Sequence, residues 1–239
     1  MFGMKRLFFC VAAGIFLPLL PAADSVEEKD LIGELRKSAE QGNAVAQLEL
    51  GHRYRKGEGV EKDLEEAVRW YCKSAEQGNA EAQRMSGSCY RLGMGVKKDL
   101  GKAVKWYRKS AGQGDPEGQH LLGTCYYLGR GVKKDFGEAV KWYRKSAEQG
   151  DPVGQLLLGK CFLFGKGVEP DPKEAVRCFR KSAEQGRADA QMWLGNCYYV
   201  GKGVKRNVDE ARKWYRKSAA QGYVPAKKLL QRYKAYGRL

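Results

Sequence analysis

The chain has 239 residues and carries 44 basic and 28 acidic residues, which gives a formal net charge of +16. This excess favours an anionic partner, such as an acidic protein or an anionic polymer. The chain has only two histidines, His52 and His120, and lacks Ser-x-x-Lys, Gly-x-Ser-x-Gly and His-Glu-x-x-His. The enzyme classes that these motifs mark are therefore excluded.

The first predicted element is a secretory signal peptide over residues 1–23. Lys5 and Arg6 precede the apolar run Leu7–Leu20, and small residues follow before Asp24, as in a signal peptide with its cleavage site. An uncleaved membrane anchor is the alternative, but the run is shorter than the roughly 20 residues of a comfortable span. We therefore expect an exported protein, periplasmic or secreted, with no membrane span after cleavage. The mature chain stays strongly basic.

The rest of the chain repeats itself every 36 residues, as the hexapeptide Lys-Ser-Ala-x-Gln-Gly shows. Its copies are Lys37–Gly42, Lys73–Gly78, Lys109–Gly114, Lys145–Gly150, Lys181–Gly186 and Lys217–Gly222. A repeat of this length cannot bury its own apolar face and must stack on its neighbours. The period therefore predicts a solenoid, a class of protein that usually binds other molecules.

Each repeat contains the start and stop signals of two helices. In the second repeat Asn79 is a good N-cap for a helix over about Ala80–Leu92, which Gly93 ends. Asp99 then caps a helix over about Leu100–Gln113, before the next glycine. With one further helix at each end of the array, the sequence predicts 12 helices.

The apolar columns of the repeat resemble a known family. The third repeat reads Leu122-Gly-x-x-Tyr126-x-x-Gly129-x-Gly131-Val132-x-x-Asp135-x-x-x-Ala139-x-x-Trp142-Tyr143-x-Lys145-x-Ala147-x-Gln149-Gly150. This pattern is similar to the Sel-1-like repeat, a relative of the tetratricopeptide repeat. The resemblance implies an all-α, right-handed superhelical α/α solenoid of tandem helix pairs whose members serve as adaptors. We expect a capping helix in 24–42, five 36-residue repeats in 43–222 and a capping helix in 223–239.

Four columns of the first helix differ from repeat to repeat, and their spacing of three and four residues places them on one face. A column without a stacking role is free to bind a ligand, although neutral drift on a solvated face is the alternative. First helices line the concave side of such solenoids, so we predict a groove that is basic and polar early and apolar later. The predicted partner-binding residues are Arg55, Arg84, Arg91, His120, Tyr127, Leu156, Leu163, Met192 and Tyr199.

Two columns that barely change are assigned structural roles. The repeated glutamine, such as Gln83, is expected to bond a neighbouring helix end. Cysteines at one position in successive repeats lie about one helix-pair spacing apart, about 10 Å, beyond the roughly 4.4–6.8 Å that a disulfide allows between Cα atoms. They read as buried apolar residues and not as a metal site. Disulfides between Cys72 and Cys89, or between Cys161 and Cys178, remain open alternatives.

The sequence therefore predicts an exported, non-catalytic, monomeric scaffold that binds a protein or peptide in its groove. No cofactor, metal or nucleic acid is expected. One alternative is a β-lactam-binding or β-lactamase-like protein, as known in a cysteine-rich secreted branch of the family. That branch pairs cysteines in columns that here hold Ala75 and Gln83, which weakens the transfer. Adhesion to an anionic envelope polymer is a further alternative.

Overall fold

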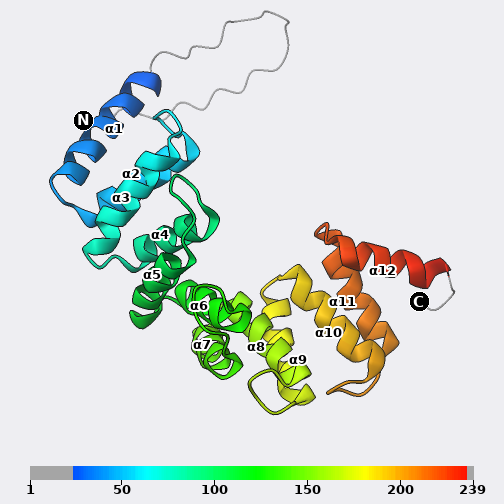
Figure 1. Cartoon of the computed structure of the whole chain (residues 1–239). Helices are drawn as coiled ribbons and strands as arrows, with labels where there is room; N and C mark the ends of the chain where they lie inside the picture. Colours follow the sequence, from blue (N-terminus) through cyan, green and yellow to red (C-terminus); the bar gives the residue numbers. More distant parts are fainter. Residues whose placement is uncertain (1–23, 236–239) are drawn as a thin grey trace, which may run out of the picture.

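The computed structural model describes residues 24–235, with side chains over 30–232, and contains twelve helices and no strand in that range (Figure 1). The predicted all-helical solenoid of tandem helix pairs is confirmed, whereas the predicted signal peptide lies outside the described residues. The helices are α1 (Asp24–Glu40), α2 (Ala44–Lys56), α3 (Leu64–Glu76), α4 (Ala80–Leu92), α5 (Leu100–Gly112), α6 (Pro116–Leu128), α7 (Phe136–Glu148), α8 (Pro152–Phe164), α9 (Pro172–Glu184), α10 (Ala188–Val200), α11 (Val208–Ala220) and α12 (Val224–Ala235).

Side-chain caps and left-handed glycines set the helix ends. The Asn79 side chain accepts a hydrogen bond from the backbone N–H of Ala82 at 2.9 Å, at the start of α4. Gly93 follows that helix at φ 74°, a conformation that glycine adopts without strain. The Asp99 side chain caps α5 by accepting from Lys102 N at 2.8 Å. These local signals explain why every first and second helix of the five repeats has 13 residues.

A glycine of each first helix lies against an aromatic ring of the second helix. A Cβ atom added at Gly123 would lie 2.8 Å from two carbons of the Tyr143 ring, and Tyr143 is buried. The missing side chain lets α6 and α7 approach closely while the ring fills the space between them. The same contact joins Gly51 to Tyr71, Gly87 to Tyr107, Gly159 to Phe179 and Gly195 to Tyr215.

A ladder of glutamines links the repeats, as the sequence predicts. The buried Gln83 donates from Nε2 to the carbonyl of Ala75, at the end of the preceding helix, at 3.0 Å. Its Oε1 accepts from Gln113 Nε2 at 2.8 Å. Both amide groups therefore satisfy buried polar partners that would otherwise destabilise the stack. The other ladder residues are Gln47 with Gln77, Gln119 with Gln149, Gln155 with Gln185, and Gln191 with Gln221.

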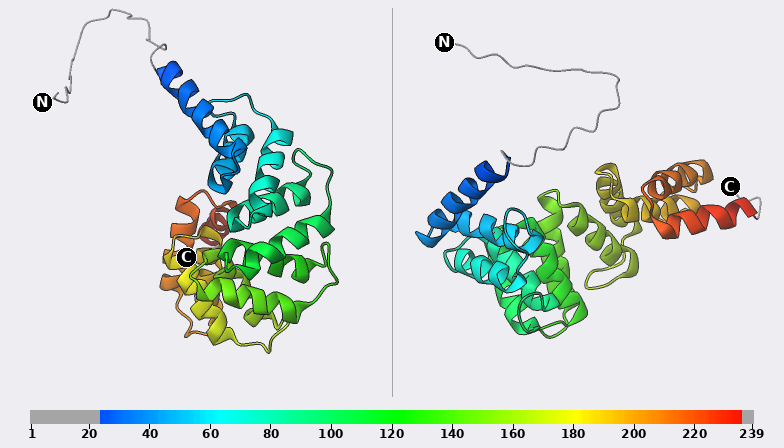
Figure 2. Two further views of the ribbon diagram at one scale, coloured as in Figure 1. Left: turned by 90° about the vertical axis from the view of Figure 1, so that its left-hand side faces the viewer. Right: turned by 90° about the horizontal axis from the view of Figure 1, so that it is seen from above.

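The stack bends so that the first helices lie inside. Each first helix packs between the second helices before and after it, and α6 also contacts α4 and α8 directly. No two second helices pack as closely in the described range. Figure 1 shows α6 and α8 on the inner side of the bend and α7 and α9 on the outer side. Figure 2 shows the same bend from two other directions, with α1 and α12 at opposite ends.

Over the described residues, no helix combines the length and apolar character needed to cross a bilayer. The longest helix, α1, has 17 residues and carries several charged side chains.

The glycine contact can be tested by adding a single methyl group. Gly123→Ala forces the Tyr143 ring or α7 to move, and should destabilise the protein by about 1–3 kcal/mol. Gly112 lies at the end of α5 with nothing within 4 Å of an added Cβ, so Gly112→Ala should leave stability unchanged or raise it by up to about 1 kcal/mol. Urea unfolding measures both effects, and equal stability of the two variants would contradict the close packing.

Candidate ligand-binding face

One varying column of the first helices contains the predicted site residues Arg84 and His120, and it lies at the junction between repeats. Arg84 Nε lies 3.3 Å from Asp115, the N-cap of α6, and His120 Nδ1 lies 2.7 Å from Asp151, the N-cap of α8. The two pairs occupy equivalent positions one repeat apart. At these two positions the varying residue contacts the cap of the next repeat, and it therefore has a stacking role.

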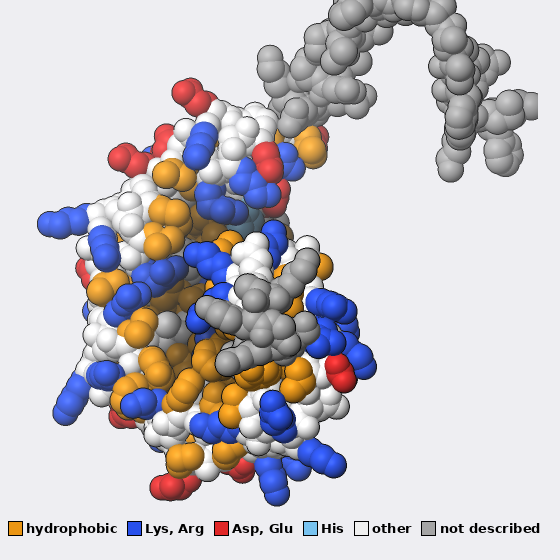
Figure 3. Space-filling model, turned by 90° about the vertical axis from the view of Figure 1, so that its right-hand side faces the viewer, with side chains coloured by type: hydrophobic (Ala, Val, Ile, Leu, Met, Phe, Trp, Pro, Cys, Tyr) orange, Lys and Arg blue, Asp and Glu red, His pale blue; other side chains and the backbone are white. Residues whose placement is uncertain are grey.

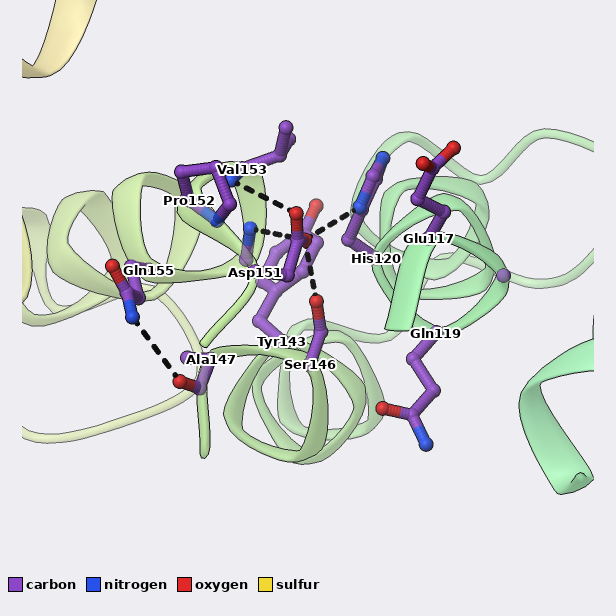
Figure 4. A network of polar contacts seen from close by, with 12 residues as sticks. Glu117, Gln119, His120, Tyr143, Ser146, Ala147, Asp151, Pro152, Val153 and Gln155 are labelled. Atoms are coloured by element: carbon purple, nitrogen blue, oxygen red, sulfur yellow. Dashed lines mark hydrogen bonds and ion pairs between the residues drawn. The ribbon is translucent and has the colours of Figure 1, made fainter. Parts of the chain in front are cut away.

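Asp151 is the centre of the polar network in Figure 4. Its Oδ2 accepts from Ser146 Oγ at 2.6 Å and from Gly154 N at 2.8 Å, in addition to His120. Burial alone would raise the pKa of the Asp151 carboxyl. The hydrogen bonds from His120 and Ser146 outweigh burial and lower the pKa from 3.8 to about 2. The network joins α6, α7 and α8 through a carboxylate that stays ionised.

The network holds a serine, a histidine and an aspartate, but not in a catalytic order. Ser146 and His120 both bond to the carboxylate of Asp151, so the imidazole is not placed between the serine and the acid. A nucleophilic serine needs a base that takes its proton. The arrangement therefore caps α8 and staples two repeats together, and it does not activate Ser146.

Another varying column, which contains Ser88 and Thr124, contacts the hydroxyl of the buried tyrosine in the same repeat. Ser88 Oγ lies 3.1 Å from Tyr107 Oη, and Tyr143 donates to Thr124 Oγ1 at 3.3 Å. His52 and Asn196 make the equivalent contacts with Tyr71 and Tyr215, at 2.9 and 2.8 Å. Different polar side chains thus perform one structural task in four of the five repeats.

The predicted basic groups of the groove are largely engaged within the chain. Arg84 contacts Glu81 and Glu117 as well as Asp115. Arg55 and Arg91 donate from Nε to the hydroxyls of Tyr71 and Tyr107, at 3.2 and 3.1 Å. These contacts hold all three arginines half-buried, and they tie Arg55 and Arg91 to the second helix of their own repeat.

The expectation that Leu156 and Leu163 lie exposed in the groove is wrong. Leu156 is 2% exposed and Leu163 is 7% exposed, and both belong to the core cluster that contains Phe179. In this repeat Phe179 has no hydroxyl to accept a bond from an arginine, and the next N-cap is Arg187 instead of an acid or an amide. Apolar side chains therefore replace the polar ones at both positions.

The remaining predicted residues are half-buried and come from several parts of the concave side. The Tyr127 ring packs edge-on against Phe136, with centroids 4.9 Å apart. Met192 and Tyr199 belong to α10, and the carbonyl of Tyr199 accepts from Arg206 Nε at 3.1 Å. The nine predicted residues therefore do not form one continuous exposed surface.

The structure instead places two rows of apolar side chains on the concave side, called here the apolar rows. The inner row is half-buried, whereas the outer row is 45–68% exposed. Their members are seven residues apart in α4, α6, α8 and α10, which puts them on one face of each helix, opposite the buried glycine. Figure 3 shows hydrophobic side chains gathered in a hollow bordered by Lys and Arg. The inner row is Met85, Leu121, Leu157 and Trp193, and the outer row is Leu92, Leu128, Phe164 and Val200.

Variation between repeats does not reveal the apolar rows, because their positions stay apolar from repeat to repeat. The outer row stays apolar in four consecutive repeats, although its members are 45–68% exposed. A solvent-exposed position has no structural reason to stay apolar. That persistence is the signal that could have found the rows.

The outer face carries lysines stacked on tryptophans. Lys145 Nζ lies 4.5 Å from the ring centroid of Trp142. Three other repeats have the same pair, with the lysine three residues after the tryptophan. The lysines therefore cover aromatic surface while their charges face solvent. The equivalent pairs are Lys73 with Trp70, Lys109 with Trp106 and Lys217 with Trp214.

All six described cysteines are free thiols, so neither of the disulfides left open by the sequence is formed. The column of four is buried, as predicted. Burial raises the pKa of the Cys89 thiol to about 11 and that of Cys161 to about 12, so these thiols stay protonated and unreactive near neutral pH. Within residues 24–235, no group of three or more potential ligands could hold a metal ion.

Helix pairs stacked around one apolar concave face define an α-solenoid, a class of repeat protein that commonly offers an extended binding surface. Five segments match the Sel1 repeat family, and the chain belongs to this family. Sel1 repeat proteins are commonly scaffolds for protein interactions. The matched segments are 44–79, 80–115, 116–151, 152–186 and 188–223.

Two solved structures are similar over most of this chain. One is c5321, a protective antigen of uropathogenic Escherichia coli with an SLR fold, which is 38% identical with a TM-score of 0.81. The match covers 88% of this chain and 45% of c5321. The other is a Sel1 repeat protein from Oxalobacter formigenes, 36% identical with a TM-score of 0.79, and the match covers 90% of both chains.

A curated relative is similar over a shorter stretch. The secretory immunoglobulin A-binding protein EsiB of Escherichia coli O6:H1, strain CFT073, is 42% identical over 68 residues. These residues are 28% of this chain and 13% of EsiB. The chain thus matches only a small part of EsiB and less than half of c5321.

The Asp151 network predicts a specific loss of stability in acid. Because the pKa of Asp151 is lowered by folding, its contribution is present above pH 3.8 and is lost as the pH falls towards 2. Asp151→Asn should cost about 2 kcal/mol near neutral pH and flatten the pH dependence below 4. Asp209 is exposed, so Asp209→Asn should change stability by less than about 0.5 kcal/mol. Equal effects of the two substitutions on urea unfolding would contradict the role of Asp151.

Proposed function

We propose that the chain is an exported, non-catalytic scaffold that binds a protein or peptide segment along its concave face. The binding surface consists of the apolar rows, with Arg55 and Arg91 at the early end of the groove. The bound segment lies across successive first helices and contacts equivalent side chains in each repeat. This use of a curved array as an extended binding surface is typical of solenoids.

The exposed outer row carries this proposal. Leu128 and Phe164 are 45% and 52% exposed in a protein whose charged side chains could cover that face. Large apolar side chains aligned over several repeats form a patch that water solvates poorly, and such patches mark sites of interaction. Aromatic anchors in a hollow supply most of the affinity at protein interfaces. Trp193 and Phe164 pack edge to face and provide such an anchor.

Relatives support a protein as the bound molecule. The name of EsiB states that it binds secretory immunoglobulin A, which is a protein. We assign this chain a protein or peptide ligand of the same broad class, without assigning it the same partner.

Export is supported by the composition of residues 1–23. Lys5 and Arg6, the apolar run Leu7–Leu20 and the small residues after it have the order of a signal peptide. Exposure to an oxidising compartment is compatible with the free cysteines, because the four in one column are buried.

The binding face can be tested with a random-peptide display library selected against the immobilised protein. Phe164→Asp and Leu128→Asp place a charge in the outer row, and each should weaken binding of the selected peptides by about tenfold or more. Isothermal titration calorimetry measures the affinities. Circular dichroism checks that the variants remain folded, as expected for substitutions at half-exposed positions.

Leu31→Asp is the matched control, because Leu31 is 55% exposed but lies on α1, away from the apolar rows. It should leave peptide affinity unchanged. The proposed function fails if no peptide is selected, or if Leu31→Asp weakens binding as much as the groove substitutions do.

The proposed export predicts a defined mature protein. Mass spectrometry of the protein from its host should find a chain that lacks residues 1–23 and begins at Asp24. Leu17→Arg interrupts the apolar run, and should leave the full-length chain inside the cell because a charge in this region blocks recognition. Recovery of an intact wild-type N-terminus would contradict cleavage.

A further inference from the structure

The fourth repeat breaks the pairing that the other four repeats share. Its second helix has Phe179 where the others have a tyrosine, so no hydroxyl is present on that ring. The residue that would bond the hydroxyl is Lys160, where the other repeats have histidine, serine, threonine or asparagine. The Lys160 ammonium on the concave face thus lacks the tyrosine hydroxyl that the equivalent residue contacts in each of the other four repeats.

The ammonium of Lys160 lies over one ring of an aromatic cluster. Its Nζ lies 5.4 Å from the ring centroid of Trp193, and this ring stacks on Phe179 with centroids 5.9 Å apart. The half-exposed Phe164 also contacts Trp193, edge to face with centroids 5.7 Å apart. Lys160, Phe164 and Trp193 therefore form a cationic aromatic corner within the apolar rows, between α8 and α10.

The nearby charges leave Lys160 without an ion pair. Asp189 is the acid that favours the charged form of Lys160 most, but Asp189 is held by Arg187 at 2.9 Å. In the described part of the chain Lys160 makes no ion pair and no side-chain hydrogen bond, and its ammonium lies over the Trp193 ring. Burial is the largest effect on the Lys160 ammonium and lowers its pKa. An incoming anion would therefore meet a partly desolvated charge, where ion pairing is stronger than at an open surface.

We propose that the corner formed by Lys160, Phe164 and Trp193 binds the carboxylate of an Asp or Glu side chain in the bound segment. The ammonium takes the carboxylate, and the rings of Phe164 and Trp193 contact an apolar side chain next to it. This inference rests on the proposed function and adds the chemical class that the groove selects. The overall positive charge of the chain attracts the same kind of ligand.

A carboxylate suits this corner better than a neutral group does. Arg55 and Arg91 occupy the concave side of other repeats, but each already donates to a tyrosine hydroxyl. Lys160 has all three ammonium hydrogens available to a ligand in the absence of such a bond. A neutral ligand would leave the half-buried ammonium of Lys160 without a counter-charge once the bound segment covers it.

The test uses the tightest peptide selected from the display library, together with an analogue in which each Glu or Asp is replaced by Gln or Asn. The protein variants are Lys160→Met and the double variant Lys160→Thr with Phe179→Tyr. The double variant recreates the pair that Thr124 and Tyr143 form in the third repeat, so it should fold normally. Lys145→Met is the matched control, because it removes a lysine stacked on Trp142 from the outer face.

The selected peptide should contain an acidic residue next to an apolar one. Lys160→Met and the double variant should each weaken its binding by about tenfold, the loss of one charge-assisted hydrogen bond. Neither should change the affinity of the amide analogue, and Lys145→Met should change neither affinity. Isothermal titration calorimetry measures all eight combinations of protein and peptide.

Three results would overturn the carboxylate site. The first is selection of peptides without acidic residues, and the second is an equal effect of Lys160→Met on acidic peptide and amide analogue. The third is an equal effect of Lys145→Met. If Phe164→Asp still abolishes binding in these cases, the groove stands and only the carboxylate site fails. If Phe164→Asp has no effect either, or no peptide is selected, both proposals fail.

Discussion

The contact between a first-helix glycine and the ring of the following second helix sets the geometry of this protein. A side chain as small as alanine at Gly123 would collide with Tyr143, so the distance between paired helices is fixed in every repeat. The glutamine ladder then fixes the register of one pair on the next, as Gln83 shows by bonding to Ala75 and Gln113. Both the close packing and the paired buried amides are needed, because a packing defect or an unpaired amide would recur in every repeat of the stack.

This regular stacking determines which surface is available for binding. The first helices lie inside the bend and direct one face towards the core and the opposite face into the hollow of Figure 3. The outward-facing second helices cover their tryptophans with lysines, as Lys145 does with Trp142. Leu128 and Phe164 have no comparable cover on the concave side. Lys160 then adds a charge where the fourth repeat lacks the tyrosine hydroxyl, and this combination gives the groove both affinity and selectivity.

The sequence predicts what the repeats keep constant, because an unchanged column reports a local rule. The helix pairs, the bond of Gln83 to a helix end and the burial of Cys161 all follow from such columns. The predicted site is wrong where a column that varies between repeats also makes structural contacts. Partners such as His120 and Asp151 are 31 residues apart in the sequence, and only the folded stack brings them side by side. The burial of Leu163 also depends on the folded stack, where it packs in one core cluster with Phe179, a ring that has no hydroxyl.

Hydroxyl-radical footprinting with and without the selected peptide tests the central claim most directly, because it reports the exposure of individual side chains in solution. In the free protein, Leu128 and Phe164 should be modified readily, whereas Leu156 and Leu163 should be protected by burial. Added peptide should then protect Leu128 and Phe164. Modification of Leu156 and Leu163 in the free protein, or peptide protection confined to the outer tryptophans such as Trp142, would contradict the account.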